Sequence, residues 1–404
     1  MSSRLNWTLA AIGILLLAAL LYQVPAVHSR LAWRVDLARA AVRNVLDPPQ
    51  ALPAPEVVTI PQLGTLTPAP TVIGPTPTAQ PSPTTLPASV QLASPSIEFQ
   101  GPNNCGPATL SMYLRYYGWD GDQYSVSDEI KPVPQDRNVN VDELVYYAQN
   151  WAGWLSSMYR VGGDVEMLEA FIAEGIPVMI EKGEIIEVDY LFNDDHWAGH
   201  YALVTGYDAA SQTFTYQDTF RGADQVMGYA ELDAFWQQFN RAYILVFLPG
   251  EEETVRRILG EHWDVDANRQ AALSTAQAET QDDPENAFAW FNLGQNQLYF
   301  EQYSQAAQSF DVARSIGLPQ RMLRYQFGPF IAYFHTNQVE TLLELVDYAL
   351  RITDVSEEAM LWKGWAYYKK GDTAGAIEMF RLAHETNPKS NEAWLALNFM
   401  GVAP

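Results

Sequence analysis

The chain of 404 residues contains a single cysteine, Cys105, and few basic side chains. One cysteine excludes an intrachain disulfide, so cysteine usage gives no information about the redox compartment. Only 24 lysines and arginines stand against 48 aspartates and glutamates, which gives a formal net charge of −24. A protein this acidic repels phosphate backbones, so we expect no nucleic-acid partner. The length leaves room for two or three domains.

Charge is also missing near the N-terminus, where residues 5–27 form an uncharged run of 23 residues. This run is long enough to cross a bilayer as a helix. A cleavable signal peptide is the alternative, but no small-x-small cleavage motif follows the run. We therefore expect a transmembrane anchor at residues 1–28. Residues 29–47 have the pattern of a basic amphipathic helix, which can lie on an anionic membrane surface.

Residues 48–95 contain 13 prolines and eight threonines but one charged residue, Glu56. Such a segment cannot bury a core, and its prolines favour extended geometry, so we predict a disordered linker. Arginines after the apolar run favour a cytoplasmic body. Because proline- and threonine-rich stalks are common outside cells, we instead expect a single-pass cell-membrane protein with extracytoplasmic globular domains.

The stretch over residues 100–118, QGPNNCGPATLSMYLRYYG, places Cys105 where a loop becomes a helix. Pro107 suits the first turn of a helix, and Gly118 supplies its C-terminal stop. A thiol at a helix N-terminus lies at the positive end of the helix dipole, which favours the thiolate. On its own, a free cysteine is more often a small buried hydrophobic residue.

Cys-Gly-Pro-Ala at the start of a helix, with Gln100 upstream, resembles the papain-fold cysteine peptidases of the bacteriocin leader-processing, or double-glycine, type. Residues 199–207, GHYALVTGY, fit that family's histidine at the head of a strand, and Asp218 fits its aspartate on the next strand. The resemblance covers about residues 96–249.

The resemblance implies a catalytic role for four residues. Cys105 would be the nucleophile, His200 the base, Asp218 the group that orients the base, and Gln100 an oxyanion donor. Two positions depart from the family pattern: Gln100 stands five residues before Cys105 where six are expected, and Thr219 follows Asp218 where a proline is usual.

The apolar patterns predict further elements in this region. Helices are expected over residues 141–151 and 165–174, and strands at 176–181, 200–207, 213–218 and 242–248. A helix that carries the nucleophile, packed on a mainly antiparallel sheet that carries the base, is an α+β papain-like domain. We assign it to residues 96–250.

His196 and His200 have the spacing of a helical zinc pair, and acidic residues lie nearby. His200 begins a predicted strand, however, and no glutamate stands between the two histidines. We therefore expect no metal ion and no cofactor, and we interpret His196 as a loop or cleft-wall residue.

Beyond residue 250 the pattern changes to helices with a period near 34. Small residues recur at equivalent places: Gly260, Gly294 and Gly364, then Ala272, Ala306 and Ala376. They resemble tetratricopeptide repeats, in which small residues allow close helix packing. The predicted units are residues 253–286, 287–322, 323–356 and 357–390, with a capping helix at 391–399. The expected fold of residues 251–404 is an all-α solenoid, and a plain helical bundle is the alternative.

In tetratricopeptide repeats, the first helix of each pair lines an inner groove. The equivalent positions here hold many aromatic residues: Phe291, Phe327, Leu361, Gln295, Ile331, Trp365, Leu298, Phe334 and Tyr368, while the first unit offers Arg257, Glu261 and Asp264. This composition predicts a recognition surface for a protein partner. The alternative is that these side chains pack against the catalytic domain or each other.

The combined prediction is a membrane-anchored thiol hydrolase that cleaves peptide or related amide bonds in a peptide or protein substrate. Its repeats would recruit that substrate or a partner. Two alternatives remain: a catalytically inactive peptide-binding adaptor, and an acyl transferase that uses the same thioester chemistry.

Overall fold

The computed structural model describes residues 45–60, 86–131, 137–186 and 194–403, and a few isolated residues between 7 and 43. They fall into two units: Met1–Gln50 with Glu187–His196, and Ala51–Ile186 with Trp197–Pro404. The apolar run at residues 5–27 lies outside the described residues, except for Trp7 and Gly13. Within the described part of the chain, no helix is both long and apolar enough to cross a membrane.

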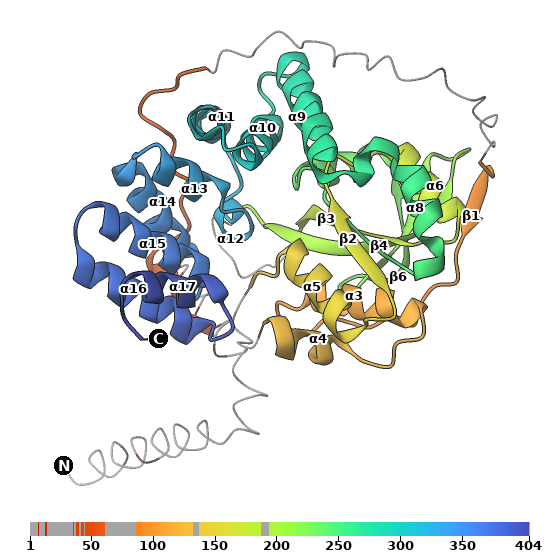
Figure 1. The fold of residues 1–404 in the computed structure, drawn as a ribbon, viewed down its shortest axis with the longest axis horizontal. Coiled ribbons are helices and arrows are strands. Elements are labelled where there is room, and N and C mark those ends of the chain that lie inside the picture. Colours follow the sequence, from red (N-terminus) through yellow and green to blue (C-terminus); the bar gives the residue numbers. More distant parts are fainter. Residues whose placement is uncertain are drawn as a thin grey trace. The chain divides into compact units, whose positions relative to one another are not determined.

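A seven-stranded antiparallel sheet organises the N-terminal part of the larger unit (Figure 1). Its strands run in the order β2-β7-β3-β4-β5-β6, and β1 pairs with β4. Their bounds are β1 Ser89–Gln91, β2 Ser156–Arg160, β3 Val178–Ile185, β4 Trp197–Asp208, β5 Thr213–Asp218, β6 Gly222–Gly228 and β7 Tyr243–Phe247. The mixed α and β architecture predicted for this region is confirmed.

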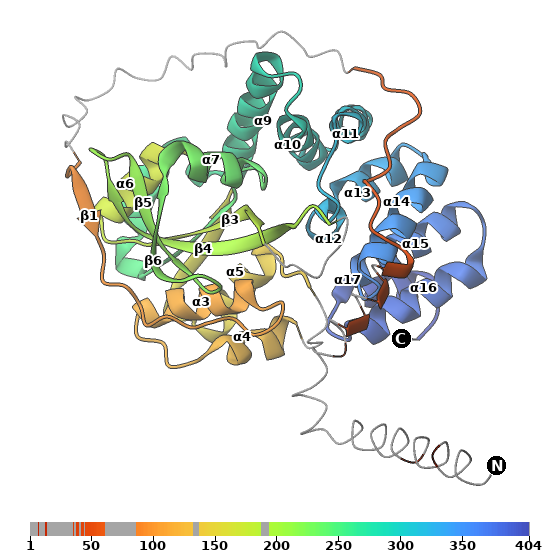
Figure 2. The same ribbon diagram turned by 180° about the vertical axis from the view of Figure 1, so that it is seen from behind.

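Helices cover both faces of the sheet (Figures 1 and 2). Along β4, Tyr201 and Leu203 pack with one group of helices, whereas Ala202 and Val204 pack with another. This alternation follows from the two-residue period of a strand. The first group is α3 (Cys105–Tyr116), α4 (Gln123–Ile130) and α5 (Val141–Trp151); the second is α6 (Val165–Ala173), α7 (Tyr229–Gln237) and α8 (Glu252–Leu259).

The structure contains elements that the sequence patterns did not predict. No helix was predicted at the position of α4. Asp122 caps this helix by accepting hydrogen bonds from the N–H groups of Tyr124 and Ser125. Strands β2 and β6 and helix α7 were also missed. Strand β4 begins at Trp197, three residues before the predicted start. Short elements with mixed polarity give little periodic signal, which explains these differences.

Two parts of the predicted linker at residues 48–95 are ordered by tertiary contacts, which corrects that expectation. Ser89–Gln91 forms β1 and pairs with the far end of β4. Leu52 is 6% exposed within the core cluster of the repeats, and the carbonyl of Pro53 accepts a hydrogen bond from Arg314 Nε at 2.9 Å. The proline-rich composition therefore does not prevent either segment from packing.

Antiparallel helix pairs follow the sheet. After α8 come α9 Val265–Asp282, α10 Ala287–Tyr299, α11 Tyr303–Ile316, α12 Met322–Tyr325, α13 Gly328–His335, α14 Val339–Ile352, α15 Glu357–Lys369, α16 Thr373–Thr386 and α17 Asn391–Phe399, with short 3-10 turns at Pro249–Glu251 and Gly260–Trp263. A Cβ added to Gly294 would lie 2.6 Å from the Phe310 ring, and one added to Gly364 would lie 2.5 Å from Phe380. These recurring glycines therefore allow the paired helices to approach closely.

Most of the predicted groove residues take part in packing. Phe291 is fully buried and Leu361 is 7% exposed. Trp365 contacts several aromatic rings, with centroid distances of 6.0 Å to Phe334 and 4.9 Å to Phe380. Tyr368 remains 40% exposed. The structure thus matches the packing alternative for the residues at the centre of the predicted groove.

The first helices of the repeats also contact the sheet domain within the larger unit. Tyr325 at the end of α12 packs edge-on against Trp197, with ring centroids 5.7 Å apart, and Trp197 stacks on Phe239 at 5.7 Å. The amide side chains of Asn240 and Asn296 exchange hydrogen bonds of 2.9 and 3.2 Å. The repeats therefore complete a surface next to the start of β4.

Candidate active site

The structure brings together three of the predicted site residues, each at the end or start of an element. Cys105 is the first residue of α3, His200 lies near the start of β4, and Asp218 ends β5. The β4–β5 pairing sets Ala202 opposite Asp218, so this carboxylate lies close to His200. The His200 Nε2 to Asp218 Oδ1 distance is 3.1 Å.

Asp218 is held in place by the turn that follows β5. Its Oδ1 accepts hydrogen bonds from the backbone N–H groups of Phe220 at 2.7 Å and Arg221 at 2.9 Å. Burial alone raises the pKa of this carboxyl, but the hydrogen bond to His200 and the charge of that imidazole outweigh it and lower the pKa. The carboxylate is therefore ionised and fixed at neutral pH.

Cys105 and His200 lie close enough for each to shift the ionisation of the other. Burial raises the pKa of Cys105, but the neighbouring His200 imidazole, with the nearby Lys131, lowers it overall. Burial lowers the pKa of His200, but the hydrogen-bonded Asp218 carboxylate and the neighbouring Cys105 raise it to about 9. These opposite shifts favour a thiolate–imidazolium pair.

Because Nε2 of His200 is turned toward Asp218, Nδ1 is the ring nitrogen left for the Cys105 sulfur. Lys131 adds positive charge nearby and is itself positioned by donating from Nζ to the Asn103 carbonyl at 2.6 Å. The side chain of Cys105 is partly accessible to solvent. A small electrophile can therefore reach the sulfur.

Glycines next to the cysteine and the histidine allow close approach. A Cβ on Gly106 would lie 3.2 Å from the ring of Tyr201. A Cβ on Gly199 would lie 2.7 Å from Phe239 and 3.1 Å from Tyr325. The first glycine thus brings α3 close to β4, and the second admits aromatic rings beside His200.

Gln100 lies beside the strand end that carries the aspartate. Its backbone N–H donates to the Thr219 carbonyl at 2.9 Å, and its Oε1 accepts from the Thr219 hydroxyl at 2.8 Å. The Nε2 donor of Gln100 has no partner among the described residues. The backbone N–H of Cys105 is a second hydrogen-bond donor. It is available because the first N–H groups of a helix have no acceptor within the helix.

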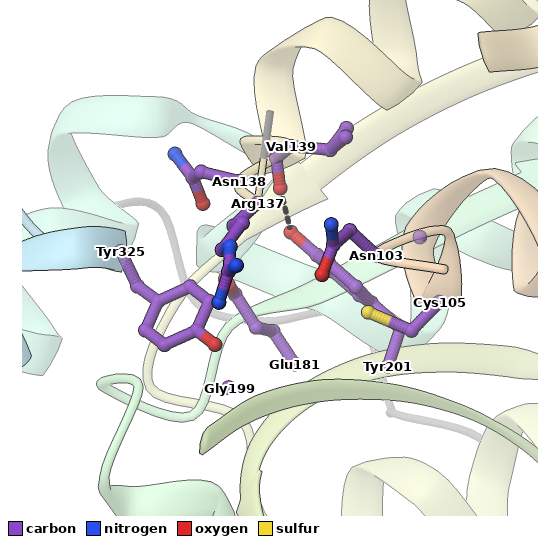
Figure 3. A pocket seen from close by; sticks show the side chains of 10 residues that line it. Asn103, Cys105, Arg137, Asn138, Val139, Glu181, Gly199, Tyr201 and Tyr325 are labelled. Atoms are coloured by element: carbon purple, nitrogen blue, oxygen red, sulfur yellow. Dashed lines mark hydrogen bonds between the residues drawn. The ribbon is translucent and has the colours of Figure 1, made fainter. Parts of the chain in front are cut away.

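A small pocket opens next to Cys105, with about 260 Å³ of space that is partly open to solvent (Figure 3). Most of its lining was not predicted: Asn103, Gly106, Arg137, Asn138, Val139, Glu181, Gly199, Tyr201 and Tyr325. The Tyr201 hydroxyl donates to the Val139 carbonyl at 2.8 Å. Tyr325 comes from the repeats, so both domains contribute to the pocket.

Glu181 is an unusual carboxyl in this lining. Burial, with the charges of Cys105 and Asp142, raises its pKa to about 8, although the neighbouring Tyr201 side chain opposes the shift. Glu181 therefore carries a proton at neutral pH. A neutral acid at this place does not repel the neighbouring thiolate.

The sequence contained no signal for most of these pocket residues. Glu181 ends a predicted strand, but periodicity does not say which face of the sheet meets the cysteine. Arg137 lies in a polar stretch without a motif, and Tyr325 is more than 200 residues from Cys105 along the chain. These pocket residues can be identified only when the packing between the domains is known.

His196 lies just after residues 187–193, which are outside the described part of the chain. Its φ is 59°, and its N–H donates to Asp194 Oδ1 at 2.7 Å. In the described ranges, no group of three or more histidine, cysteine, aspartate or glutamate side chains is arranged to hold a metal ion.

Two protein-family models match parts of the chain. The model of the family described as Peptidase_C39 like matches residues 84–244, and a tetratricopeptide repeat model matches residues 358–390. No curated protein matches the sequence.

Several solved structures are similar to parts of the chain. One, a C39-like peptidase from Bacillus anthracis, has 17% identity and a TM-score of 0.31, and the match covers 39% of this chain and 96% of that one. Another is a double glycine motif protease from an AMS/PCAT transporter in complex with its leader peptide, with 18% identity, a TM-score of 0.29, and coverage of 39% and 94%. A third, MamA from Desulfovibrio magneticus RS-1, has 16% identity, a TM-score of 0.30, and coverage of 33% and 75%.

The family match spans strands β1 to β6 and includes Cys105, His200 and Asp218, and the repeat match spans helices α15 and α16. The chain therefore combines a C39-like peptidase domain with a helical region that carries a tetratricopeptide repeat.

Proposed function

We propose that the protein is a cysteine peptidase that cleaves peptide or related amide bonds through Cys105, His200 and Asp218. The observation that carries this proposal is the alignment of Cys105, His200 and Asp218, with His200 Nε2 3.1 Å from Asp218 Oδ1 and opposite pKa shifts at the neighbouring thiol and imidazole. Such a pair supplies both a nucleophile and an acid at neutral pH.

In the first step, the Cys105 thiolate attacks the carbonyl carbon of the scissile amide, and a C–S bond forms. The negative charge moves to the carbonyl oxygen, where the Cys105 N–H and the Gln100 Nε2 are the proposed donors. The imidazolium of His200 then gives its proton to the leaving nitrogen as the C–N bond breaks. The products are an amine and a thioester on Cys105.

In the second step, His200 is neutral and removes a proton from a water molecule, whose oxygen attacks the thioester carbonyl. The C–S bond breaks, the carboxylic acid leaves, and the proton on His200 restores the pair with the thiolate. Asp218 holds the imidazole in one orientation and stabilises its charged form throughout, as the buried carboxylate of a catalytic triad does.

The test is alkylation of the full-length protein with iodoacetamide at pH 6. We expect Cys105 to react faster than a free model thiol, because a free thiol is mostly protonated at this pH. His200→Ala should slow the reaction by at least about tenfold. Labelling no faster than the model thiol would reject the peptidase mechanism and favour a catalytically inactive adaptor.

The role of Gln100 can be tested separately, because alkylation develops no oxyanion. A short peptide aldehyde adds to a cysteine to give a charged tetrahedral adduct, so its affinity reports on the oxyanion donors. If Nε2 of Gln100 donates, Gln100→Ala should weaken aldehyde binding by about tenfold or more and leave the pH 6 alkylation rate unchanged. Equal aldehyde affinity in both proteins would remove Gln100 from the site.

We also propose that the uncharged run at residues 5–27 anchors the protein in the cell membrane, with the globular domains outside the cytoplasm. The length of the run and the proline- and threonine-rich segment after it support this placement. Protease added to intact cells should release an acidic fragment that contains Cys105. Protection of that fragment until the membrane is broken would reverse the orientation.

The repeats are proposed to recruit a protein partner or substrate. Exposed side chains of the repeats support this proposal. At the C-terminal end, Tyr368 is 40% exposed and Phe399 is 61% exposed. Replacing both with serine should leave the affinity for the peptide aldehyde intact and reduce the cleavage rate of a native protein substrate. An unchanged cleavage rate would exclude this surface from substrate recruitment.

A further inference from the structure

An arginine without a partner lines the pocket beside the proposed nucleophile. Arg137 is partly buried, shares the pocket lining with Cys105, and makes no hydrogen bond or ion pair within the described part of the chain (Figure 3). A guanidinium presents five N–H donors in a planar fork that fits a carboxylate. In a protein with a net charge of −24, an unpaired arginine next to a reactive group calls for an explanation.

A second arginine, from the repeats, adds positive charge near Arg137. The charge of Arg137 acts on Arg324 and, after burial, helps to lower its pKa, so these two guanidinium groups are close enough to repel each other. Arg324 donates to the neutral Thr353 hydroxyl at 2.8 Å, and this bond leaves its positive charge in place.

The remaining lining does not cancel this charge. Glu181 carries a proton at neutral pH, and the Cys105–His200 pair is neutral as a whole. Asn138, Tyr201 and Tyr325 contribute neutral polar or aromatic groups. Arg137 therefore adds positive charge to the pocket lining that it shares with Cys105.

We propose that Arg137 binds a carboxylate of the substrate, so that the enzyme prefers peptides with an acidic side chain or a terminal carboxylate next to the scissile bond. Arg137 acts here as a specificity-determining residue. Arg324 raises the local potential, and the repeats thereby take part in substrate choice. This inference rests on the proposed peptidase function and names a substrate class for it.

The test compares alkylating probes that differ by one charge. N-bromoacetyl-glutamate α-amide and N-bromoacetyl-glutamine α-amide have nearly the same shape, and only the first carries a side-chain carboxylate. N-bromoacetyl-alanine and its amide form the same comparison for a terminal carboxylate. The second-order rate of Cys105 alkylation is measured for the full-length protein at pH 6.5, with iodoacetamide as the neutral reference.

We expect the anionic member of at least one pair to react about tenfold faster than its neutral partner, because a hydrogen-bonded ion pair in a pocket contributes that much binding. The pair that shows the preference identifies the source of the carboxylate. Arg137→Gln should abolish the preference, which is measured as the ratio of the two rates within each pair. Arg137→Lys should keep part of it, since the charge remains but the fork is lost.

A matched control removes the same charge elsewhere. Arg381 is exposed on α16, and Arg381→Gln should keep the full preference. The inference is wrong if the preference survives in Arg137→Gln, or if the two rates are equal within both pairs in the wild type. If labelling by iodoacetamide is still fast in that case, the proposed peptidase function remains. Slow labelling by iodoacetamide itself instead removes the proposed function.

Discussion

Glu181 and Tyr201 are Cα partners in the β3–β4 pairing, and both line the pocket beside Cys105. The pairing brings an acid to the wall of the pocket that holds Cys105. Burial raises the pKa of Glu181 from 4.5 to about 8, and the charge of Cys105 adds to this. A proton on Glu181 is therefore a property of the folded protein.

This proton gives the first prediction, for Glu181→Gln. Between about pH 4.5 and 8 the folded state holds a proton that the unfolded chain has lost, so the free energy of unfolding falls as the pH rises through this window. Glutamine cannot ionise and removes that dependence. We expect the variant to gain on the wild type as the pH rises, by roughly 3–4 kcal/mol between pH 5 and pH 8.

Urea unfolding at several pH values between 5 and 8 measures this difference. Glu253→Gln is the matched control, because Glu253 is exposed on α8. Its unfolding free energy should follow that of the wild type at every pH. Parallel curves for Glu181→Gln and the wild type would mean that Glu181 is ionised in the folded protein.

The second prediction concerns Asp218→Asn. The carboxylate of Asp218 helps to raise the pKa of His200 to about 9 against the effect of burial, so removing its charge lowers that pKa. The thiolate–imidazolium pair then persists over a narrower pH range. We expect the rate of iodoacetamide alkylation at pH 6 to fall by about tenfold, and the upper end of the plateau in the rate–pH profile to move below pH 9.

Asp224→Asn provides the control, since Asp224 is an exposed acid on β6 that accepts hydrogen bonds from Ser94 and Gln217. It should retain the wild-type profile. If the plateau of Asp218→Asn still ends near pH 9, another group holds the imidazolium and the assigned role of Asp218 is wrong.

The sequence predicted the parts of the site that have local signals. Cys105 begins a helix after a loop with glycine and proline, and His200 and Asp218 lie on strands with clear apolar alternation. Their order along the chain then suffices to align them with a family. The α+β architecture and the helix pairs follow from periodicity in the same way.

The rest of the pocket depends on packing between distant segments. Arg137, which precedes α5, lines the pocket of Cys105 because α5 packs on the same face of the sheet as α3. Tyr325 lines it because the repeats dock beside β4. Neither contact has a sequence pattern of its own. The aromatic positions of the repeats allowed two interpretations for the same reason, because an aromatic residue at a groove position suits a core equally well.

A third prediction concerns the recurring glycines of the repeats. In Gly294→Ala the new methyl group would lie 2.6 Å from the Phe310 ring, which is too close for a carbon contact. Either the ring or the helix must shift, and we expect a loss of about 1–3 kcal/mol of stability despite the better helix propensity of alanine. Gly250→Ala is the control, because nothing lies within 4 Å of its added Cβ. Thermal unfolding measures both, and equal midpoints would show that the helix pair has room to spare.

The last prediction concerns the segment before the peptidase domain. Leu52 is 6% exposed in the core cluster of the repeats, whereas Val57, five residues later, is 77% exposed. Leu52→Ala should therefore cost about 2 kcal/mol of stability, because it removes buried methyl groups and leaves a cavity, and Val57→Ala should cost almost nothing.

Hydrogen exchange locates the effect of Leu52→Ala. Arg314 donates to the carbonyl of Pro53, so loss of the docked segment should also speed exchange along α11, which carries Arg314. Exchange in α3 should stay unchanged, because the core cluster of that helix does not include Leu52. Equal stability of Leu52→Ala and Val57→Ala, with no change in α11, would mean that the segment does not dock in solution. A selective change in α11 would mean that the repeats bind an extended proline-rich segment of their own chain.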